Sequence, residues 1–547
     1  MKIFKDVSKV FMRSKLFLIT TLLTICFSVK YAIKYYGYEA DIGMISTQLN
    51  QTLKTSFYLF FVVMFLAYEF YMKFQHNGIQ EVAAVTEEGS KKKHLFCAFC
   101  TMTVWIVLIT ICLSVCTIIS FKYYKVPDSN GYIIHIIENM MVNIFLILEL
   151  GSLIGLLLSK TRKRILSYAV ILLVIYGVSP YVERIADAQA VSGNVTHSIY
   201  PLVELFNIMP LVNSGFPTMD PFGENILFYR VSLILFWIMA VLTFIFWTNQ
   251  ASKKKMAVSI LAMACFFYGY AAPASRVNMN GNPANTMAHD QYYYETDDQP
   301  TKVKVEKANY SIPEYKMSLK VGRQLSAKVE MKVNKSLNSY KMTLYHGYKV
   351  KKACDQKGNK LSFGQKNDYI LVKNQGREPI EKITLEYEGA SASYYSNNQG
   401  IYLPGDFAYY PRAGYVALHD DEGMKMTSCF VNKKTKFDLK VSTRKKIYTN
   451  LQEKDGVYAG ISDGATIFSG FYREKKFGNG NRLVYPYISD FYYAKDQGLE
   501  KICDEDEKEL ERLGKSGVTV FVAPNVNQMR TCDIGENQIL VRMTPYF

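Results

Sequence analysis

The chain has 547 residues, of which 49% are hydrophobic, and it carries 64 Lys and Arg residues against 48 Asp and Glu residues, a formal net charge of +16. This length exceeds that of one ordinary domain and suits two or three. Much of the positive charge falls in short loops between apolar segments, which indicates membrane topology plus a solvated surface and argues against nucleic-acid binding.

Seven apolar segments in the first half of the chain predict membrane-spanning helices, because a span needs about 20 mostly apolar residues. In chain order they are Leu16–Ile33, Ser56–Met72, Leu95–Phe121, Ile133–Leu158, Ile165–Val178, Ile226–Trp247 and Met256–Ala272. The fifth and seventh are short, which leaves a partly re-entrant path open for them. The first has a long apolar run that contains Lys30, so we do not interpret it as a cleaved signal peptide.

The Lys and Arg residues of the connecting loops predict the orientation of the chain. Basic clusters precede the first segment and follow the second, fourth and sixth: Lys2–Lys15, Lys91–Lys93, Lys160–Arg164 and Lys253–Lys255. Because basic loops stay on the cytoplasmic side, we expect a multi-pass protein of the plasma membrane with a cytoplasmic N-terminus. Seven spans then leave everything after residue 273 in an extracellular domain.

Ionisable residues inside apolar segments are costly and mark candidate functional positions. Glu69, Glu149 and Arg230 are the candidates for a substrate path. Glu149 is the deepest, and small residues follow it at Gly151 and Gly155. Such residues allow helices to pack closely, so two interpretations of Glu149 stay open: a polar contact between helices and a position on the substrate path.

The loop after the second span predicts a short amphipathic helix at the cytoplasmic face. Asn77-Gly78 is a turn signal, and Ile79, Val82 and Val85 recur at helical spacing beside Glu81. A helix in this position is well placed to dock on a cytoplasmic partner.

This half of the chain resembles the permease subunits of ABC-type exporters of the two-times-six-span class. In that family a Glu, a Gly-Ile or Gly-Thr pair and a short coupling helix follow the second span, which Glu69, Gly78, Ile79, Glu81 and Val82 match. The stretch Phe145–Lys160 also resembles that family's fourth span. The resemblance covers roughly residues 1–250.

The resemblance implies that transport is energised by a separate ABC ATPase chain. It assigns the coupling role to Gly78, Ile79, Glu81, Val82 and Val85. The phosphate-cradling loop G-x-x-x-x-G-K-[ST] is absent from the sequence, so we expect no cofactor in this chain and ATP bound by the partner. A second permease chain, identical or different, is expected to complete the pathway in the lipid bilayer.

The second half of the chain predicts a β-rich domain. After a linker over 276–304, short segments alternate apolar and polar residues, with turn signals between them. The predicted strands are Tyr315–Val321, Ala327–Val333, Tyr340–Tyr345, Tyr369–Val372, Ile380–Tyr387, Phe437–Ser442 and Val457–Ile461. A helix over Asp504–Leu513 and a buried strand over Val518–Val522 follow.

The predicted fold class is therefore a membrane all-α bundle of six spans plus a seventh, followed by an extracellular all-β sandwich-like domain with a short α/β C-terminal part. The predicted boundaries are 1–250 for the permease domain, 251–275 for the seventh span, 276–304 for the linker and 305–547 for the outer domain. The outer domain has four cysteines, which allow three disulfide pairings: Cys354, Cys429, Cys503 and Cys532.

The outer domain resembles the N-terminal β-domain of zinc aminopeptidases of the aminopeptidase N type, over roughly residues 305–540. The resemblance rests on Tyr387-Glu-Gly389, on the stretch Gly400–Pro411, and on Phe437–Val441 with Ile467–Phe471. The zinc-binding motif H-E-x-x-H is absent from the sequence. We therefore expect neither a metal site nor peptidase activity, and the peptidase-like domain suggests a peptide or other amphipathic substrate by analogy only.

Several features of the outer domain have two interpretations. His419, near Cys429, is either part of a Cys/His pair or, as expected for a lone histidine in a polar loop, solvated. An acidic run over Asp504–Glu511 is interpreted as a charged helix face, with a cation site as the alternative. An aromatic set is either domain core and rim or a peptide-binding surface: Tyr409, Tyr410, Tyr415, Tyr485, Tyr487, Phe491, Tyr492 and Tyr493.

Two other functions remain open from the sequence. One is a non-transporting membrane receptor or scaffold whose extracellular domain binds a peptide or a protein. The other is a membrane-anchored peptidase that works with a separate catalytic chain. A co-purifying ATPase favours transport, whereas zinc and aminopeptidase activity in the intact complex favour the peptidase.

Overall fold

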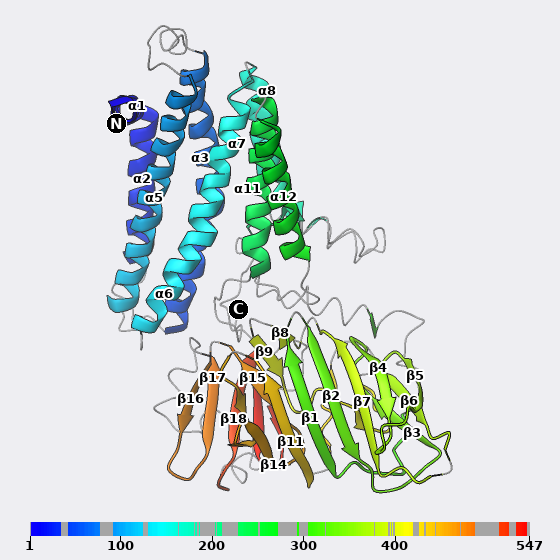
Figure 1. The fold of residues 1–547 in the computed structure, drawn as a ribbon. Coiled ribbons are helices and arrows are strands. Elements are labelled where there is room, and N and C mark those ends of the chain that lie inside the picture. The colour runs from blue at the N-terminus through cyan, green and yellow to red at the C-terminus, as the bar shows by residue number, and fades with distance from the viewer. Residues whose placement is uncertain are drawn as a thin grey trace. The chain divides into compact units, whose positions relative to one another are not determined.

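The computed structural model separates the chain into a helical unit that ends at Ala272 and a β-rich unit that begins at Pro273 (Figure 1). It describes residues 2–33, 42–76, 91–123, 129–161, 163–179, 181–182, 185, 203, 205–209, 228–249, 252–271, 293–294, 305–322, 324–376, 378–391, 394, 396–397, 400–419, 426–431, 434–443, 445–470, 472–486, 514–524 and 532–543.

Helices occupy all seven of the apolar segments predicted to span the membrane. The helical elements are α1 (Lys2–Met12), α2 (Lys15–Ile33), α3 (Ile42–His76), α5 (Lys91–Tyr123), α6 (Ser129–Met140), η1 (Met141–Leu146), α7 (Ile147–Leu158), α8 (Arg164–Gly177), α11 (Phe228–Thr248) and α12 (Lys253–Ala271). Within the described residues, four helical stretches are long and apolar enough to cross a membrane: Thr52–Gln75, Lys93–Tyr123, Ile136–Leu158 and Arg230–Thr248.

Two helices joined at a bend count as a fifth candidate span if they are taken together. The segments Ile3–Met12 and Lys15–Phe27 meet at 73° and pass the same test together. The fifth predicted span is the shorter apolar helix Arg164–Gly177, and α12, the seventh, is not among the helices that qualify. The helical unit is compatible with a membrane-embedded protein, while the count of six spans plus one stays a prediction.

The fourth predicted span is not a uniform α-helix. Between α6 and α7 the backbone forms the π-helical segment η1. Such single π segments inside α-helices often mark functional sites. The side chains of Asn143 and Ile144 from this segment are buried.

Glycines bring α3 and α7 close together, as the small residues after Glu149 predicted. A Cβ atom added to Gly155 would lie 2.7 Å from the Cβ of Ala67 and 2.8 Å from the carbonyl oxygen of Met64. One added to Gly151 would lie 3.0 Å from the ring of Phe60. The two helices therefore meet with backbone almost against side chain, which leaves no room for a larger residue at Gly155.

A seven-stranded sheet forms the largest part of the β-rich unit (Figure 1). Its strands are, in spatial order, β13 (Gln452–Lys454), β14 (Val457–Ser462), β11 (Thr435–Ser442), β1 (Glu314–Val321), β2 (Leu325–Lys332), β7 (Lys382–Gly389) and β4 (Tyr348–Cys354). Only β1 and β11 pair in parallel. The seven strands predicted from the alternating pattern are all present, five of them in this sheet: β1, β2, β7, β11 and β14.

The strict alternation of burial in β1 and β2 gives this sheet one apolar face and one charged face. Tyr315, Met317 and Leu319 point into the core. The opposite face carries cross-strand ion pairs, with Lys436 Nζ 3.0 Å from Glu314 Oε1 and Lys382 Nζ 3.1 Å from Glu330 Oε2. These exposed pairs each contribute little to stability, but they keep this face soluble.

Two four-stranded sheets and one five-stranded sheet complete the β-rich unit. The first comprises β10 (Arg412–Ala413), β3 (Ser339–Thr343), β6 (Tyr369–Lys373) and β5 (Ser362–Lys366). The second comprises β12 (Tyr448–Thr449), β15 (Ile467–Ser469), β9 (Gly400–Leu403) and β8 (Ser396–Asn397). The third comprises β16 (Tyr472–Lys476), β17 (Arg482–Pro486), β18 (Thr519–Pro524), β20 (Gln538–Met543) and β19 (Cys532–Ile534).

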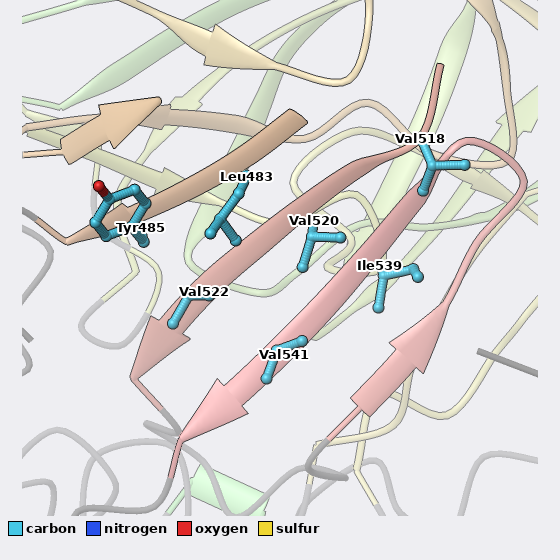
Figure 2. Packing of buried hydrophobic residues seen from close by; sticks show 7 residues of the cluster. All are labelled: Leu483, Tyr485, Val518, Val520, Val522, Ile539 and Val541. Atoms are coloured by element: carbon cyan, nitrogen blue, oxygen red, sulfur yellow. The ribbon is translucent and has the colours of Figure 1, made fainter. Parts of the chain in front are cut away.

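The five-stranded sheet is mixed, which departs from an antiparallel arrangement, while the α/β character of the C-terminal part stays a prediction. Its strand β18 pairs in parallel with both β17 and β20. Figure 2 shows the apolar cluster on one face of these three strands: Leu483, Tyr485, Val518, Val520, Val522, Ile539 and Val541. The strand predicted over Val518–Val522 is thus confirmed, whereas the helix predicted over Asp504–Leu513 lies outside the described residues.

Candidate functional site

The three candidate residues of the substrate path lie on three different helices of the helical unit. Glu69 is on α3, Glu149 is on α7 and Arg230 is in the first turn of α11. Glu149 and Arg230 are 7% and 3% exposed. The helices around them are apolar, so both ionisable groups are buried in a mostly apolar environment, which is costly.

Glu149 has an unusual environment for a carboxylate. Both of its oxygen atoms are buried, and neither has a hydrogen-bond partner among the described residues. The hydroxyl group of Thr103 on α5 lies beside the carboxyl group and interacts with it, although no hydrogen bond between them has good distance and angle. Tyr71 of α3 and Cys100 of α5 complete the neighbourhood. Thr103 is therefore the candidate partner for a polar contact between helices, and both interpretations of Glu149 stay predictions.

Polar contacts between α3 and α7 occur next to Glu149 rather than at it. The hydroxyl groups of Tyr71 and Ser152 are 2.9 Å apart, and both residues are fully buried. Nearer the C-terminal end of α3, the Gln75 amide donates to the Ser159 hydroxyl at 2.8 Å. These pairs hold the two helices in register around the carboxylate.

Arg230 is held by the π-helical segment. Its Nε donates to Asn143 Oδ1 at 2.8 Å, and its Nη2 donates to the carbonyl oxygen of Ile208 at 2.8 Å. Asn143 in turn donates to Asn139 Oδ1 at 3.0 Å. The guanidinium group thus joins α11 to η1 and to the segment that contains Ile208.

Glu69 is paired with a residue of α8. The Tyr168 hydroxyl donates to Glu69 Oε1 at 2.5 Å. A related contact ties α7 to α11, because Lys160 Nζ donates to Thr248 Oγ1 at 2.5 Å and to Asn249 Oδ1 at 2.8 Å at the C-terminal end of α11. An ammonium group is favourable at a helix C-terminus.

Among the described residues, Glu149 has no hydrogen bond from Arg230. Glu69 accepts a hydrogen bond from Tyr168. Sequence reasoning missed Tyr71, Thr103 and Asn143, which surround or hold the candidates. Uncharged polar residues within an apolar run are the signal that was available. The coupling residues Gly78, Ile79, Glu81, Val82 and Val85 lie outside the described residues.

In the β-rich unit, histidines and tyrosines form a second polar cluster. Tyr294 is 4% exposed and its hydroxyl donates to Asp368 Oδ2 at 2.8 Å. Asp368 Oδ1 accepts from the backbone N–H of His346 at 2.6 Å. The ring of Tyr293 stacks on His346 with 3.5 Å between centroids, and Tyr294 stacks on His419 at 3.8 Å.

Two expectations are corrected by this cluster. His419 is 5% exposed and packed on an aromatic ring, so it is not a solvated loop residue. Tyr294 belongs to the stretch 276–304, which its composition marked as a linker with little core material, yet this side chain is core. The residues next to Tyr294 in the sequence are mostly polar, so the sequence does not indicate that Tyr294 is buried. Its burial depends on partners that are distant in the chain.

The stretch Gly400–Pro411, which carries the resemblance to aminopeptidases, is buried throughout. The Tyr409 hydroxyl donates to the carbonyl oxygen of Ala465 at 2.6 Å, and the Tyr387 hydroxyl donates to that of Tyr409 at 2.7 Å. Asp406 pairs with the buried Arg542 of β20. This motif thus joins the second four-stranded sheet to the mixed sheet.

The same region decides between the two interpretations of the aromatic set for the residues that the structure describes. Tyr409, Tyr410 and Tyr485 are buried, so they belong to the core and not to a binding surface. Tyr415 is partly buried, and Tyr487 and Phe491–Tyr493 lie outside the described residues.

The described part of the chain contains neither a metal-binding cluster nor a disulfide between Cys354 and Cys429. Cys354 and Cys429 are buried free thiols, and burial raises the pKa of Cys429. The described residues contain no group of three or more His, Cys, Asp or Glu side chains arranged to hold a metal ion.

Comparisons with known proteins give distant and partial matches to solved structures. No protein-family model matches the chain, and no curated protein matches it. The native leukotriene A4 hydrolase of Saccharomyces cerevisiae is 12% identical, with a TM-score of 0.30, over 46% of this chain and 44% of that one. An M1 zinc metallopeptidase of Deinococcus radiodurans is 12% identical, with a TM-score of 0.25, over 44% of this chain and 61% of that one. The chain spans less than two thirds of either enzyme, and the likeness is distant and partial.

Proposed function

We propose that this chain is the membrane-spanning permease subunit of an ABC-type transporter that exports or clears a peptide or another amphipathic substrate. A separate ATPase chain binds and hydrolyses ATP, and a second permease chain completes the pathway in the plasma membrane. In this proposal the N-terminus is cytoplasmic, the β-rich unit is extracellular, and the chain itself is not an enzyme.

One observation carries the proposal: ionisable side chains are buried among the apolar helices. Glu149 is 7% exposed and Arg230 is 3% exposed. Ionisable groups at such positions are characteristic of proteins that move substrates across membranes. The uneven distribution of Lys and Arg between loops supports the orientation.

The coupling segment makes the proposal testable. The full-length tagged chain, purified in mild detergent from its native host, is expected to retain an ATPase subunit and ATPase activity. Ile79→Asp and Val82→Asp each place a charge on the apolar face of the predicted helix, so each is expected to release the ATPase. Gln80→Asp adds the same charge on the polar face and is the matched control.

Each result has a defined meaning. Loss of ATPase with the two apolar-face variants but not with the control supports a permease coupled through this helix. A wild-type chain that elutes without ATPase activity contradicts the transport proposal. In that case the non-transporting receptor or scaffold becomes the better proposal, with the β-rich unit as the place where a peptide or protein binds.

A further inference from the structure

We propose that Glu149 is a proton-binding site at mid-depth in the helical unit, neutral while the contact between α3 and α7 is closed. The first ground is the missing hydrogen bonds. An ionised carboxylate has about four positions that accept hydrogen bonds, and among the described residues neither oxygen of Glu149 has a hydrogen bond of good geometry. The Thr103 hydroxyl beside the carboxyl group interacts with it but carries no charge. An unpaired buried charge costs far more free energy than a neutral carboxylic acid in the same place.

The second ground is that no neighbouring group supplies a counter-charge. From α3 the group that interacts with Glu149 is Tyr71, and from α5 it is Cys100. The cation of α11, Arg230, donates to Asn143 and Ile208, and η1 contains no ionisable residue. A bound proton neutralises the carboxylate without a partner.

The third ground is the position of the residue. Glu149 precedes Ser159, the C-cap of α7, by ten residues, which is about 15 Å along a helix axis. That distance is about half of the roughly 30 Å hydrocarbon thickness. At this depth water cannot replace the missing partners, whereas a residue near either surface would reach it.

The fourth ground is the tight contact between α3 and α7. Gly155 allows the close approach of Ala67 and Met64, so the two helices pack without space between them at this point. Separation of the two helices would expose Glu149 and allow it to ionise. Glu149 would therefore release its proton on opening and bind one on closing.

Infrared difference spectroscopy on the full-length protein in lipid tests this inference. At neutral pH, the spectrum of wild type minus Glu149→Gln is expected to contain a carboxylic-acid C=O band that shifts in D₂O. The matched control is Glu138→Gln, because Glu138 is exposed on α6 and its substitution is expected to leave the C=O band of the wild type in place. Equal helical content of both variants by circular dichroism verifies that they fold.

Two outcomes would overturn the inference. Carboxylate bands in place of the C=O band would mean that Glu149 is ionised and paired. Carboxylate bands that respond to Na⁺ would mean that the site holds a metal cation rather than a proton. The spectra do not depend on transport, so a chain with the C=O band but without a co-purifying ATPase would keep this inference and lose the proposed function.

Discussion

Single residues in the β-rich unit show how buried charge is managed where partners exist. Arg542 is fully buried between Asp406 and Asp533, and Asp463 accepts from the backbone N–H of Glu536 at 2.8 Å and from the Gln538 amide at 3.3 Å. Such groups are stable only because each receives hydrogen bonds. Glu149 in the helical unit has none of these partners, and this contrast is what singles it out.

Asp463 predicts a pH effect on the stability of the β-rich unit. Burial raises its pKa above the ordinary value of 3.8, although its hydrogen bonds act in the opposite direction. The folded form therefore holds the proton more tightly than the unfolded form. Its contribution to stability is complete below pH 3.8 and is lost as the pH rises through the folded-state pKa.

Asp463→Asn removes this titration while keeping one acceptor oxygen. We expect the unfolding midpoint of the variant in urea, followed by pulse proteolysis, to fall less steeply with rising pH in the window just above pH 3.8. An identical pH dependence in variant and wild type would show that another group is responsible.

Gly389 predicts a large effect from one added methyl group. It ends β7 with φ of +157°, and a Cβ atom there would lie 2.0 Å from the carbonyl oxygen of Gly347. Gly389→Ala must displace backbone, so we expect a loss of about 1–3 kcal/mol in the free energy of unfolding. Gly364→Ala in β5 is the control, because its Cβ would meet nothing within 4 Å. Equal stability of the two variants would contradict the explanation.

At the scale of elements, glycines allow close packing between α3 and α7. Polar pairs such as Tyr71 with Ser152 fix its register, and Gly155 sets its distance. In lipid such contacts depend on close packing rather than on the hydrophobic effect. A substitution that separates the helices is therefore expected to weaken the whole bundle.

Gly155→Ala tests this contact. The new Cβ would lie 2.7 Å from the Cβ of Ala67, so we expect a lower thermal midpoint in detergent and faster alkylation of Cys100, which lies near Glu149 on α5. Gly177→Ala, whose Cβ meets nothing within 4 Å, should leave both measurements unchanged. No change in the Gly155 variant would show that the helices adjust at little cost.

At the scale of the whole molecule, the sequence predicts the elements better than their long-range contacts. Alternation placed β1, β2 and β7 because each strand buries every second residue against one core. The parallel pairing of β1 with β11 joins residues more than a hundred positions apart, and nothing local specifies it. Tyr294 was missed for the same reason, since its partners Asp368 and His419 are distant in the chain.

The candidate site shows the same division. The cost of charge in apolar surroundings identified Glu149 and Arg230 from sequence, because that cost is local. Asn143 accepts the hydrogen bond from Arg230 from within a π-helical segment. The amino-acid pattern does not predict this π-helical segment. The coupling segment stays a prediction, because residues 77–90 lie outside the described part of the chain.

The π-helical segment also changes how the fourth helix must be drawn on a helical wheel. A π turn accommodates an extra residue, which shifts the angular phase of everything that follows by about 100°. A single wheel through Ser129–Leu158 therefore assigns the wrong side to either α6 or α7. Removing one residue from Met141–Leu146 would restore a common phase and carry Asn143 away from Arg230. A related sequence that is one residue shorter here would need another acceptor for this guanidinium group.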